Sequence, residues 1–154
     1  MKTITKLVLA ILGVVFAIST SIAQDYKHPY GLVKEDGKVL DASGKHIGWV
    51  TKDGIIKDTA GAKIAHVDSE GSLVDAKTGK KLGKAQKNGN YVPHFTKTPD
   101  DKGLTTSAPM NGTCEVKNSK GETIVVVHES YKQYGACAYH CLTMKKEHKD
   151  MKMK

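Results

Sequence analysis

Residues 30–93 read YGLVKEDGKVLDASGKHIGWVTKDGIIKDTAGAKIAHVDSEGSLVDAKTGKKLGKAQKNGNYVP, and this stretch decides the fold because it repeats itself. One pattern recurs every 17 residues, as GKVLD at 37–41, GIIKD at 54–58 and GSLVD at 71–75. A second pattern lies between these copies, as YGLV at 30–33, IGWV at 47–50, IAHV at 64–67 and LGKA at 82–85. Its fourth copy comes one residue late because Thr78 lengthens a turn. A fixed internal period of this length indicates a repeat architecture.

Turn sequences separate the short apolar segments of this repeat. Alternating β-branched and polar residues predict strands, and Asp-Gly pairs at 36–37 and 53–54 predict tight hairpins between them. A second kind of turn begins with Asp41, Asp58 or Asp75, whose carboxylates can accept hydrogen bonds from turn amides. Calcium binding is the alternative for these aspartates, but one carboxylate per turn supplies few of the six to eight oxygen ligands that calcium takes.

A fifth copy of the repeat follows an insertion. Residues 93–113 are rich in Thr, Pro, Asp and Gly, which predicts a loop. Beyond this loop, VKNSKG at 116–121 aligns with VDAKTG at 74–79, and IVVV at 124–127 aligns with LGKA at 82–85. The second pattern therefore occurs five times.

Strands this short must bury one another, so we predict an all-β domain over residues 24–130 in which five short hairpin repeats close around an axis. An open β-solenoid is the alternative. A closed ring would bring the strand at Tyr30 beside the strand at Ile124. A small residue also recurs within the strands, as Gly31, Gly48, Ala65 and Gly83, and predicts a close approach around that axis.

The N-terminus has the features of a secretory signal peptide at residues 1–23. Lys2 and Lys6 precede an 11-residue apolar run, and Ala23 ends a small-residue cleavage site. A transmembrane anchor is the alternative, but a bilayer needs roughly 20 apolar residues. We therefore expect an exported protein, periplasmic or extracellular, with no membrane span in the mature chain.

The composition argues against nucleic-acid binding. The chain has a net charge of +8, and removal of Lys2 and Lys6 with the signal peptide leaves +6. All 24 basic residues are Lys, and Arg, whose guanidinium makes most bidentate contacts to phosphates and bases, is absent. The lysines are interleaved with Asp and Glu, so we interpret the charge as a solvated surface and expect no nucleic-acid partner.

Residues 131–154 combine a predicted helix with a basic tail. On this helix Cys137, Cys141, Met144 and His148 would share one face. One interpretation is that the face packs on the end of the β ring, since Cys and Met are common in protein cores.

The other interpretation is that the same helix holds a functional cluster. Cys137, His140 and Cys141 would bind copper or zinc, with Met144 or His128 completing the set, or would take part in thiol redox chemistry. The spacing is not that of a zinc finger or a haem attachment site.

Three cysteines in an exported protein predict one disulfide. We expect it to join Cys114 to Cys137 or Cys141. A Cys137–Cys141 bond is less favoured, because two cysteines one helical turn apart have poor geometry for a disulfide.

Five copies, an export signal and a helical tail together resemble the secreted bacterial five-fold β-flower proteins. The motifs that carry the resemblance are DG at 36–37 and 53–54 and IGWV at 47–50. The resemblance implies a closed ring of short hairpins and brings no established activity and no functional residues. Val125 replaces the small residue in the fifth copy, which departs from strict symmetry.

We expect the chain not to be an enzyme, because it contains no nucleophile elbow, metalloprotease helix or phosphate loop. The leading hypothesis is an exported binding or structural module without a cofactor. It would contact a protein or glycan through the 93–113 loop or through exposed aromatic side chains, namely Trp49, Tyr91 and Phe95. A soft-metal or thiol-redox protein that uses the C-terminal cluster is the alternative.

Overall fold

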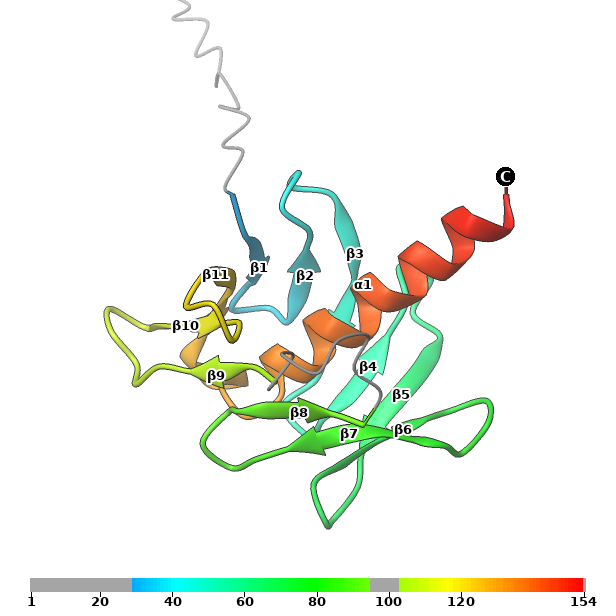
Figure 1. Cartoon of the computed structure of the whole chain (residues 1–154), viewed down its shortest axis with the longest axis horizontal. Coiled ribbons are helices and arrows are strands. Elements are labelled where there is room, and N and C mark those ends of the chain that lie inside the picture. Colours follow the sequence, from blue (N-terminus) through cyan, green and yellow to red (C-terminus); the bar gives the residue numbers. More distant parts are fainter. Residues whose placement is uncertain (1–28, 95–102, 154) are drawn as a thin grey trace, which may run out of the picture.

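The computed structural model describes residues 29–94 and 103–153, with side chains described through Lys145 and at Met153. The predicted signal peptide at 1–23 and Phe95 lie outside this part of the chain. Within it, eleven strands precede one long helix (Figure 1). The elements are β1 (Gly31–Val33), β2 (Lys38–Leu40), β3 (His46–Val50), β4 (Ile55–Lys57), β5 (Lys63–Val67), β6 (Ser72–Asp75), β7 (Lys81–Ala85), β8 (Tyr91–Pro93), β9 (Thr105–Thr106), β10 (Thr113–Lys117), β11 (Thr123–His128), the 3-10 helix η1 (Glu129–Tyr131) and α1 (Gly135–Lys152).

The eleven strands form one mixed sheet in the order β8-β7-β6-β5-β4-β3-β2-β1-β11-β10-β9. Neighbouring strands are antiparallel except β1 and β11, which are parallel and place Gly31 opposite Val125. The strand that follows Tyr30 thus lies beside the strand that contains Ile124, as the closed-ring prediction requires.

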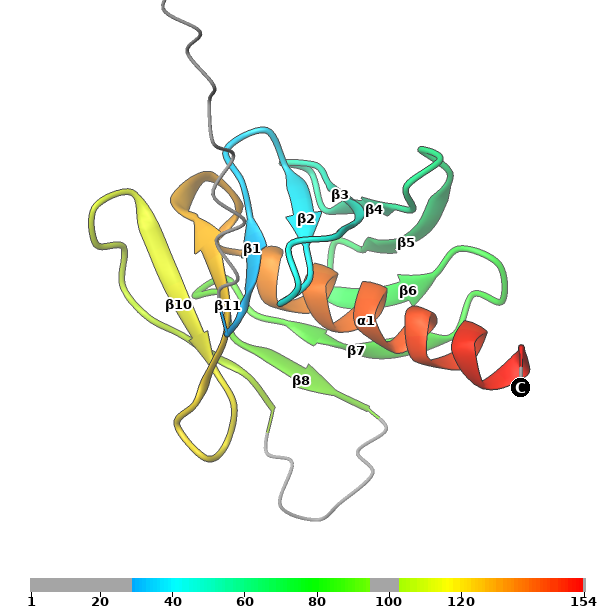
Figure 2. The ribbon, with the colours of Figure 1, turned by 90° about the horizontal axis from the view of Figure 1, so that it is seen from above.

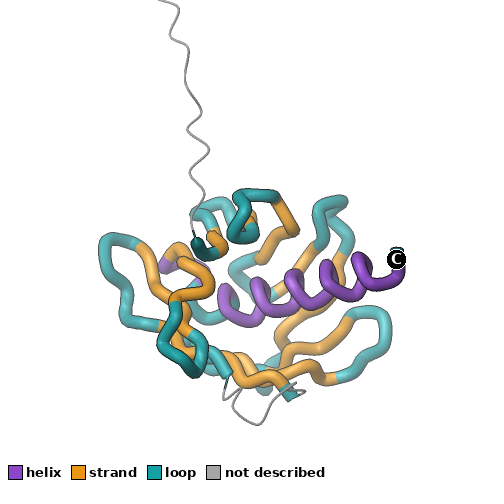
Figure 3. Tube along the Cα trace, turned by 45° about the horizontal axis from the view of Figure 1, so that its top comes forward, coloured by secondary structure: helices purple, strands orange, loops and turns teal. Residues whose placement is uncertain are grey.

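The two ends of the sheet meet and nearly close it into a barrel, and Figure 3 shows the chain encircling the helix. Tyr91 and Leu104 exchange backbone hydrogen bonds, with N···O distances of 3.0 Å from Tyr91 N and 2.7 Å from Leu104 N. Beside them, Thr106 N donates to Asn90 Oδ1 at 2.8 Å, and the Thr106 hydroxyl donates to Gly89 O at 2.7 Å. These bonds satisfy backbone groups that a free sheet edge would expose. The mainly β prediction is confirmed, and an open solenoid does not describe this sheet.

The predicted hairpin turns recur with the same backbone geometry. Gly37 has a φ of +82°, and its carbonyl accepts a hydrogen bond from Val50 N at 2.9 Å. The same bond joins Gly54 and Val67 at 2.9 Å. A Cβ at Gly37 would overlap the Val50 carbonyl oxygen, so both the positive φ and the space require glycine there.

The predicted capping by aspartates is also confirmed. Asp41 Oδ1 accepts hydrogen bonds from the amides of Ser43 at 2.9 Å and Lys45 at 3.0 Å. Asp58 Oδ1 accepts from the amides two and four residues further on, both at 2.9 Å. These carboxylates stabilise the turns by satisfying amides that lie outside the sheet ladder.

Helix α1 lies against the concave side of the curved sheet, with strands on both sides of its first half (Figures 1 and 2). It contacts β1, β3, β7 and β11. The small strand residues allow this approach: a Cβ at Gly31 would overlap the Tyr139 ring, and a Cβ at Gly48 would meet the side chain of Leu142 at 2.6 Å. The predicted close approach therefore exists, and both the helix and neighbouring strands make it, since a Cβ at Gly48 would also overlap Lys57 O on β4.

The core fills the space between this concave face and the first half of α1. The centres of β2, β4 and β6 supply Val39, Ile56 and Leu73, all wholly buried and all at equivalent positions of the sequence repeat. The helix supplies Ala136, Cys137, Ala138, Cys141 and Leu142. Burial of one Leu, Ile or Val side chain stabilises a fold by roughly 1.5–3 kcal/mol, so the helix is an integral part of this core.

Part of the segment 103–113, which belongs to the predicted loop, joins the sheet and the core. Leu104 is only 7% exposed and belongs to the core, and β9 follows it directly. The loop prediction is thus wrong for residues 104–106, whereas no strand lies between Thr106 and Thr113. Tertiary pairing explains the difference, because Thr105 and Thr106 pair with β10 and need no extended β pattern of their own.

Candidate functional site

A cavity of about 360 Å³ lies between α1 and the hairpins of β6, β7 and β8. The strands line it with Leu73, Asp75, Leu82, Tyr91 and Pro93. The helix lines it with His140, Cys141, Met144 and Lys145. Residues at i, i+1, i+4 and i+5 lie together on one side of a helix, so one face of α1 forms a complete wall.

The predicted helix face does pack inward, with Cys137 and Cys141 buried and Met144 half-buried, but Cys137 lies in the core and does not line the cavity. Cys137 is wholly buried, and its Sγ donates to Tyr134 O at 3.1 Å. Burial raises the pKa of this thiol, and the neighbouring Cys141 raises it further. The packing interpretation holds for Cys137.

Cys141 borders the cavity but is only 3% exposed. Burial raises the pKa of its thiol to about 11, with opposing smaller effects from Lys145, which lowers it, and Asp75, which raises it. The thiol is thus protonated at neutral pH. Because the thiolate is the nucleophile in disulfide exchange, this environment argues against the thiol-redox hypothesis.

Tyr91 forms the floor of the cavity opposite the helix. Its hydroxyl donates to Leu82 O at 3.3 Å, and its ring centroid lies 5.2 Å from that of His140. Burial, followed by the nearby cysteines, raises the pKa of Tyr91. The expectation of an exposed Tyr91 is wrong, because β8 turns Tyr91 inward and leaves Val92, at 42% exposed, outside.

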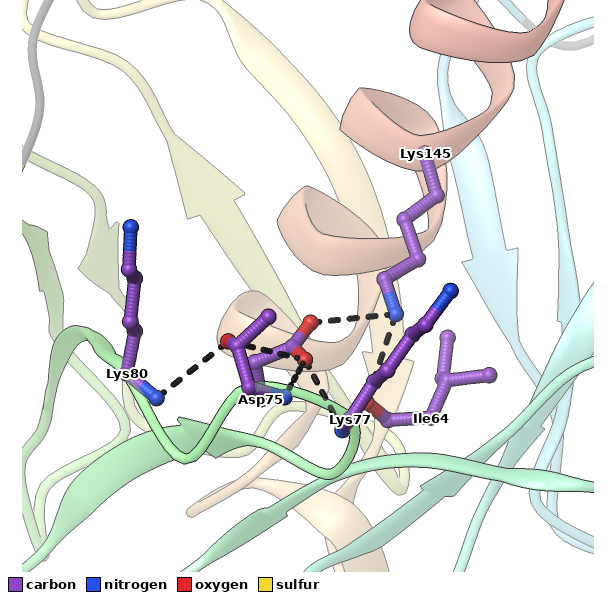
Figure 4. Close-up of polar contacts among 6 residues, drawn as sticks. Ile64, Asp75, Lys77, Lys80 and Lys145 are labelled. Carbon is purple, nitrogen blue, oxygen red and sulfur yellow. Dashed lines mark hydrogen bonds and ion pairs between the residues drawn. The ribbon is translucent and has the colours of Figure 1, made fainter.

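Two of the residues that line the cavity, Asp75 and Lys145, form an ion pair (Figure 4). Lys145 Nζ lies 3.3 Å from Asp75 Oδ2 and also donates to Ile64 O at 3.3 Å. Asp75 Oδ1 accepts from the amides of Lys77 and Thr78, both at 2.9 Å. Burial alone would raise the pKa of Asp75, but the hydrogen bonds from Thr78, Lys145 and Lys77 outweigh it and hold the pKa below its usual value.

The predicted disulfide is not formed, and Cys114, Cys137 and Cys141 are all free and buried. Their surroundings differ: burial raises the pKa of the Cys114 thiol, with smaller opposing effects from Lys132 and from Glu129 of η1, whereas Cys141 borders the cavity. The expected disulfide required the strand of Cys114 to pack on the helix, but Cys114 lies on β10, whereas α1 packs on β1, β3, β7 and β11.

The predicted metal ligands are only partly brought together. His140 and Cys141 line the cavity, Cys137 does not, and His128 is elsewhere, where its Nδ1 accepts a hydrogen bond from Ser130 N at 3.3 Å. In the described chain, no three side chains of the His, Cys, Asp and Glu types gather as a metal cluster. Met144, which the sequence offered as a completing ligand, does line the cavity.

Two features of the cavity were missed by sequence reasoning. Asp75 was interpreted only as a turn cap, and Lys145 only as part of the basic tail. Their pairing joins residues 70 positions apart, and no periodic signal marks it. The docking of Leu142 on Gly48 and of Tyr139 on Gly31 fixes the rotation of α1 about its axis. A sequence signal for this rotation would have identified Lys145 as a residue of the cavity wall.

The predicted contact surface at Trp49 is half-buried on the outer face of the sheet. Trp49 lies opposite Lys38 on β2 and Lys57 on β4. Lys38 Nζ is 5.8 Å from the centre of the Trp49 ring, and the His46 ring contacts it edge-on at 4.8 Å. The indole is thus already contacted from more than one side, which reduces the ring surface open to a partner.

Within the described residues, no helix has both the length and the apolar character that crossing a bilayer requires. No protein-family model matches this chain, and comparisons with curated proteins and with solved structures find no significant match.

Proposed function

We propose that this chain is an exported, non-enzymatic binding module whose ligand occupies the cavity between α1 and β6–β8. The observation that carries the proposal is the cavity itself. Its volume of about 360 Å³ lies within the range of small-molecule sites, and its walls are mostly apolar with a few polar groups at defined places. Export is supported by the signal-like residues 1–23.

The polar groups of the cavity favour binding over catalysis. Lys145 is paired with Asp75, the Tyr91 hydroxyl is bonded to Leu82 O, and the Cys141 thiol is protonated at neutral pH. A catalytic base or nucleophile needs a pKa near the working pH or an adjacent activating group. The three side chains are therefore better suited to orienting a bound ligand than to reacting with it.

We also infer that the sheet is built from five hairpin repeats, as in the β-flower proteins that the sequence resembles. Irregularities of the strand register support this inference, because they follow equivalent positions of the repeat. Three of them occur after Val39, Ile56 and Leu73, which share one position of the sequence repeat. The fourth occurs after Val116, which precedes the turn-capping Asn118 by two residues, as Val39 precedes the turn-capping Asp41.

The fluorescent apolar anion 1-anilinonaphthalene-8-sulfonate tests the binding proposal. The folded wild type should bind the dye and increase its fluorescence. Leu82→Trp, which fills the cavity, should abolish this binding. Val92→Trp, a matched control on the outer face of β8, should preserve it. Equal dye binding by both variants, with folding verified by circular dichroism, would contradict the proposed site.

A further inference from the structure

Three side chains with soft donor atoms converge on the cavity from one helical turn of α1. His140, Cys141 and Met144 all line it. Met144 is four residues from His140 and three from Cys141, spacings that place Cβ atoms about 5–6 Å apart on a helix surface. Met144 is thus a neighbour on the helix surface of both His140 and Cys141, and its rotatable side chain can bring its sulfur toward either donor. These three residues are called the donor triangle below.

We propose that this cavity is a copper(I) site with the His140 imidazole, the Cys141 sulfur and the Met144 thioether as ligands. The inference rests on the proposed function, because it identifies the ligand of the same cavity. Copper(I) selects thiolate and thioether ligands and also binds imidazole, so the three donor types match one ion.

Charge balance favours copper(I) over zinc. A single thiolate neutralises a monovalent ion, whereas zinc bound to the same donors would leave one positive charge in a mostly apolar cavity. A buried uncompensated charge costs several kcal/mol. Asp75, the carboxylate in the cavity wall, is already paired with Lys145 and hydrogen-bonded to turn amides.

Ligand number leads to the same choice. Structural zinc takes four protein ligands, and no three His, Cys, Asp or Glu side chains of the described residues are arranged to hold a metal ion. Calcium and magnesium require a shell of oxygen atoms. The donor triangle contains one nitrogen and two sulfur atoms, which suits a soft ion of low coordination number.

The binding step is a proton exchange. Copper(I) forms a bond to Cys141 Sγ, the S–H bond breaks, and the proton leaves to solvent. The ion enters in its reduced state, so no electron is transferred and no oxidant is needed. The product carries no net charge at the metal and its thiolate.

The test is competition for copper(I) against the chromogenic chelator bicinchoninate, without oxygen and with a reductant present. The wild type should withdraw an equimolar amount of copper(I) from the chelator. Met144→Leu and His140→Gln should each weaken affinity by at least about tenfold, since loss of a residue that merely orients a metal ligand already costs that much. Cys141→Ala should lose the ion, which native mass spectrometry would show directly.

Matched controls separate the triangle from other thiols and thioethers. Met110→Leu removes an exposed methionine, and Cys137→Ala removes a buried thiol outside the cavity, so both should bind like the wild type. Wild-type protein that cannot compete with the chelator, or Met144→Leu that competes as well as wild type, would overturn the copper site. Dye binding that persists in either case would leave the proposed function intact, whereas loss of the dye result alone would overturn only that function.

Discussion

Lys145 Nζ lies 3.3 Å from Asp75 Oδ2 and joins helix α1 to the β6–β7 hairpin, 70 residues earlier in the chain (Figure 4). The same ammonium group reaches Ile64 O on β5. The Asp75 side chain is only 13% exposed, so solvent screens this ion pair less than an ordinary surface pair. The ion pair therefore holds α1 in the position in which it forms one wall of the cavity.

Lys145→Met should therefore lower the free energy of unfolding by about 1 kcal/mol, the upper end of the range for partly exposed ion pairs. Urea denaturation would measure the change. Lys81→Met is the matched control, because Lys81 pairs with Glu70 at a similar 3.2 Å but with side chains 52% and 69% exposed. That variant should stay within about 0.5 kcal/mol of wild type. Equal losses of unfolding free energy in the two variants would show that the burial of Asp75 does not strengthen its ion pair.

The acid sensitivity of the fold should depend in part on Asp75. The pKa of this carboxyl is lowered from its ordinary value of 3.8, so the folded state binds its proton less readily than the unfolded chain does. Stability from this group is present above pH 3.8 and is lost as the pH falls through the lower, folded-state pKa. Asp75→Asn, which keeps an acceptor for the turn amides, should show a shallower loss of stability at acidic pH.

Lys145→Met should flatten the same part of the pH profile, because Lys145 contributes to lowering the pKa of Asp75. Some acid sensitivity should remain in both variants, since hydrogen bonds also lower the pKa values of Asp53 and Asp68. A stability profile of Asp75→Asn that runs parallel to wild type below pH 3.8 would contradict this assignment.

The docking of α1 should depend on the missing side chain at Gly31. A Cβ there would overlap the Tyr139 ring, so Gly31→Ala should destabilise the fold by about 1–3 kcal/mol, as overpacking does. In the Gly31→Ala/Tyr139→Ala double variant the added methyl group no longer meets the ring. The combined loss should be smaller than the sum of the single losses in thermal unfolding. Additive losses would mean that the ring does not pack on Gly31.

Much of the sheet follows from local signals in the sequence, and the site does not. The 17-residue period and the Asp-Gly turns predict the hairpins and the neighbours of each strand. The small residue at Gly31 predicts that another segment packs closely on the strand there. The closed-ring prediction also placed the strand at Tyr30 near the strand at Ile124, and the structure pairs these two strands. These features depend on residues close in sequence or on the repeat itself.

The cavity depends instead on the rotation of α1 about its axis. The row of soft residues at Cys137, Cys141 and Met144 predicted one inward face, and Cys137 and Cys141 are indeed buried. The docking of Tyr139 on Gly31 and of Leu142 on Gly48 fixes the exact rotation, which places Lys145 beside Asp75. Such a rotation is set by packing between distant segments, which helical spacing alone cannot specify.

The state of the cysteines gives a further prediction. Cys114 and Cys137 are wholly buried, Cys141 is 3% exposed, and none is in a disulfide. The folded protein, purified without a reductant, should therefore resist alkylation by iodoacetamide at neutral pH, because the thiols are both inaccessible and protonated. After denaturation in urea, still without a reductant, mass spectrometry should show all three cysteines alkylated. A single alkylated cysteine would instead show that the exported chain holds the disulfide that its sequence predicted.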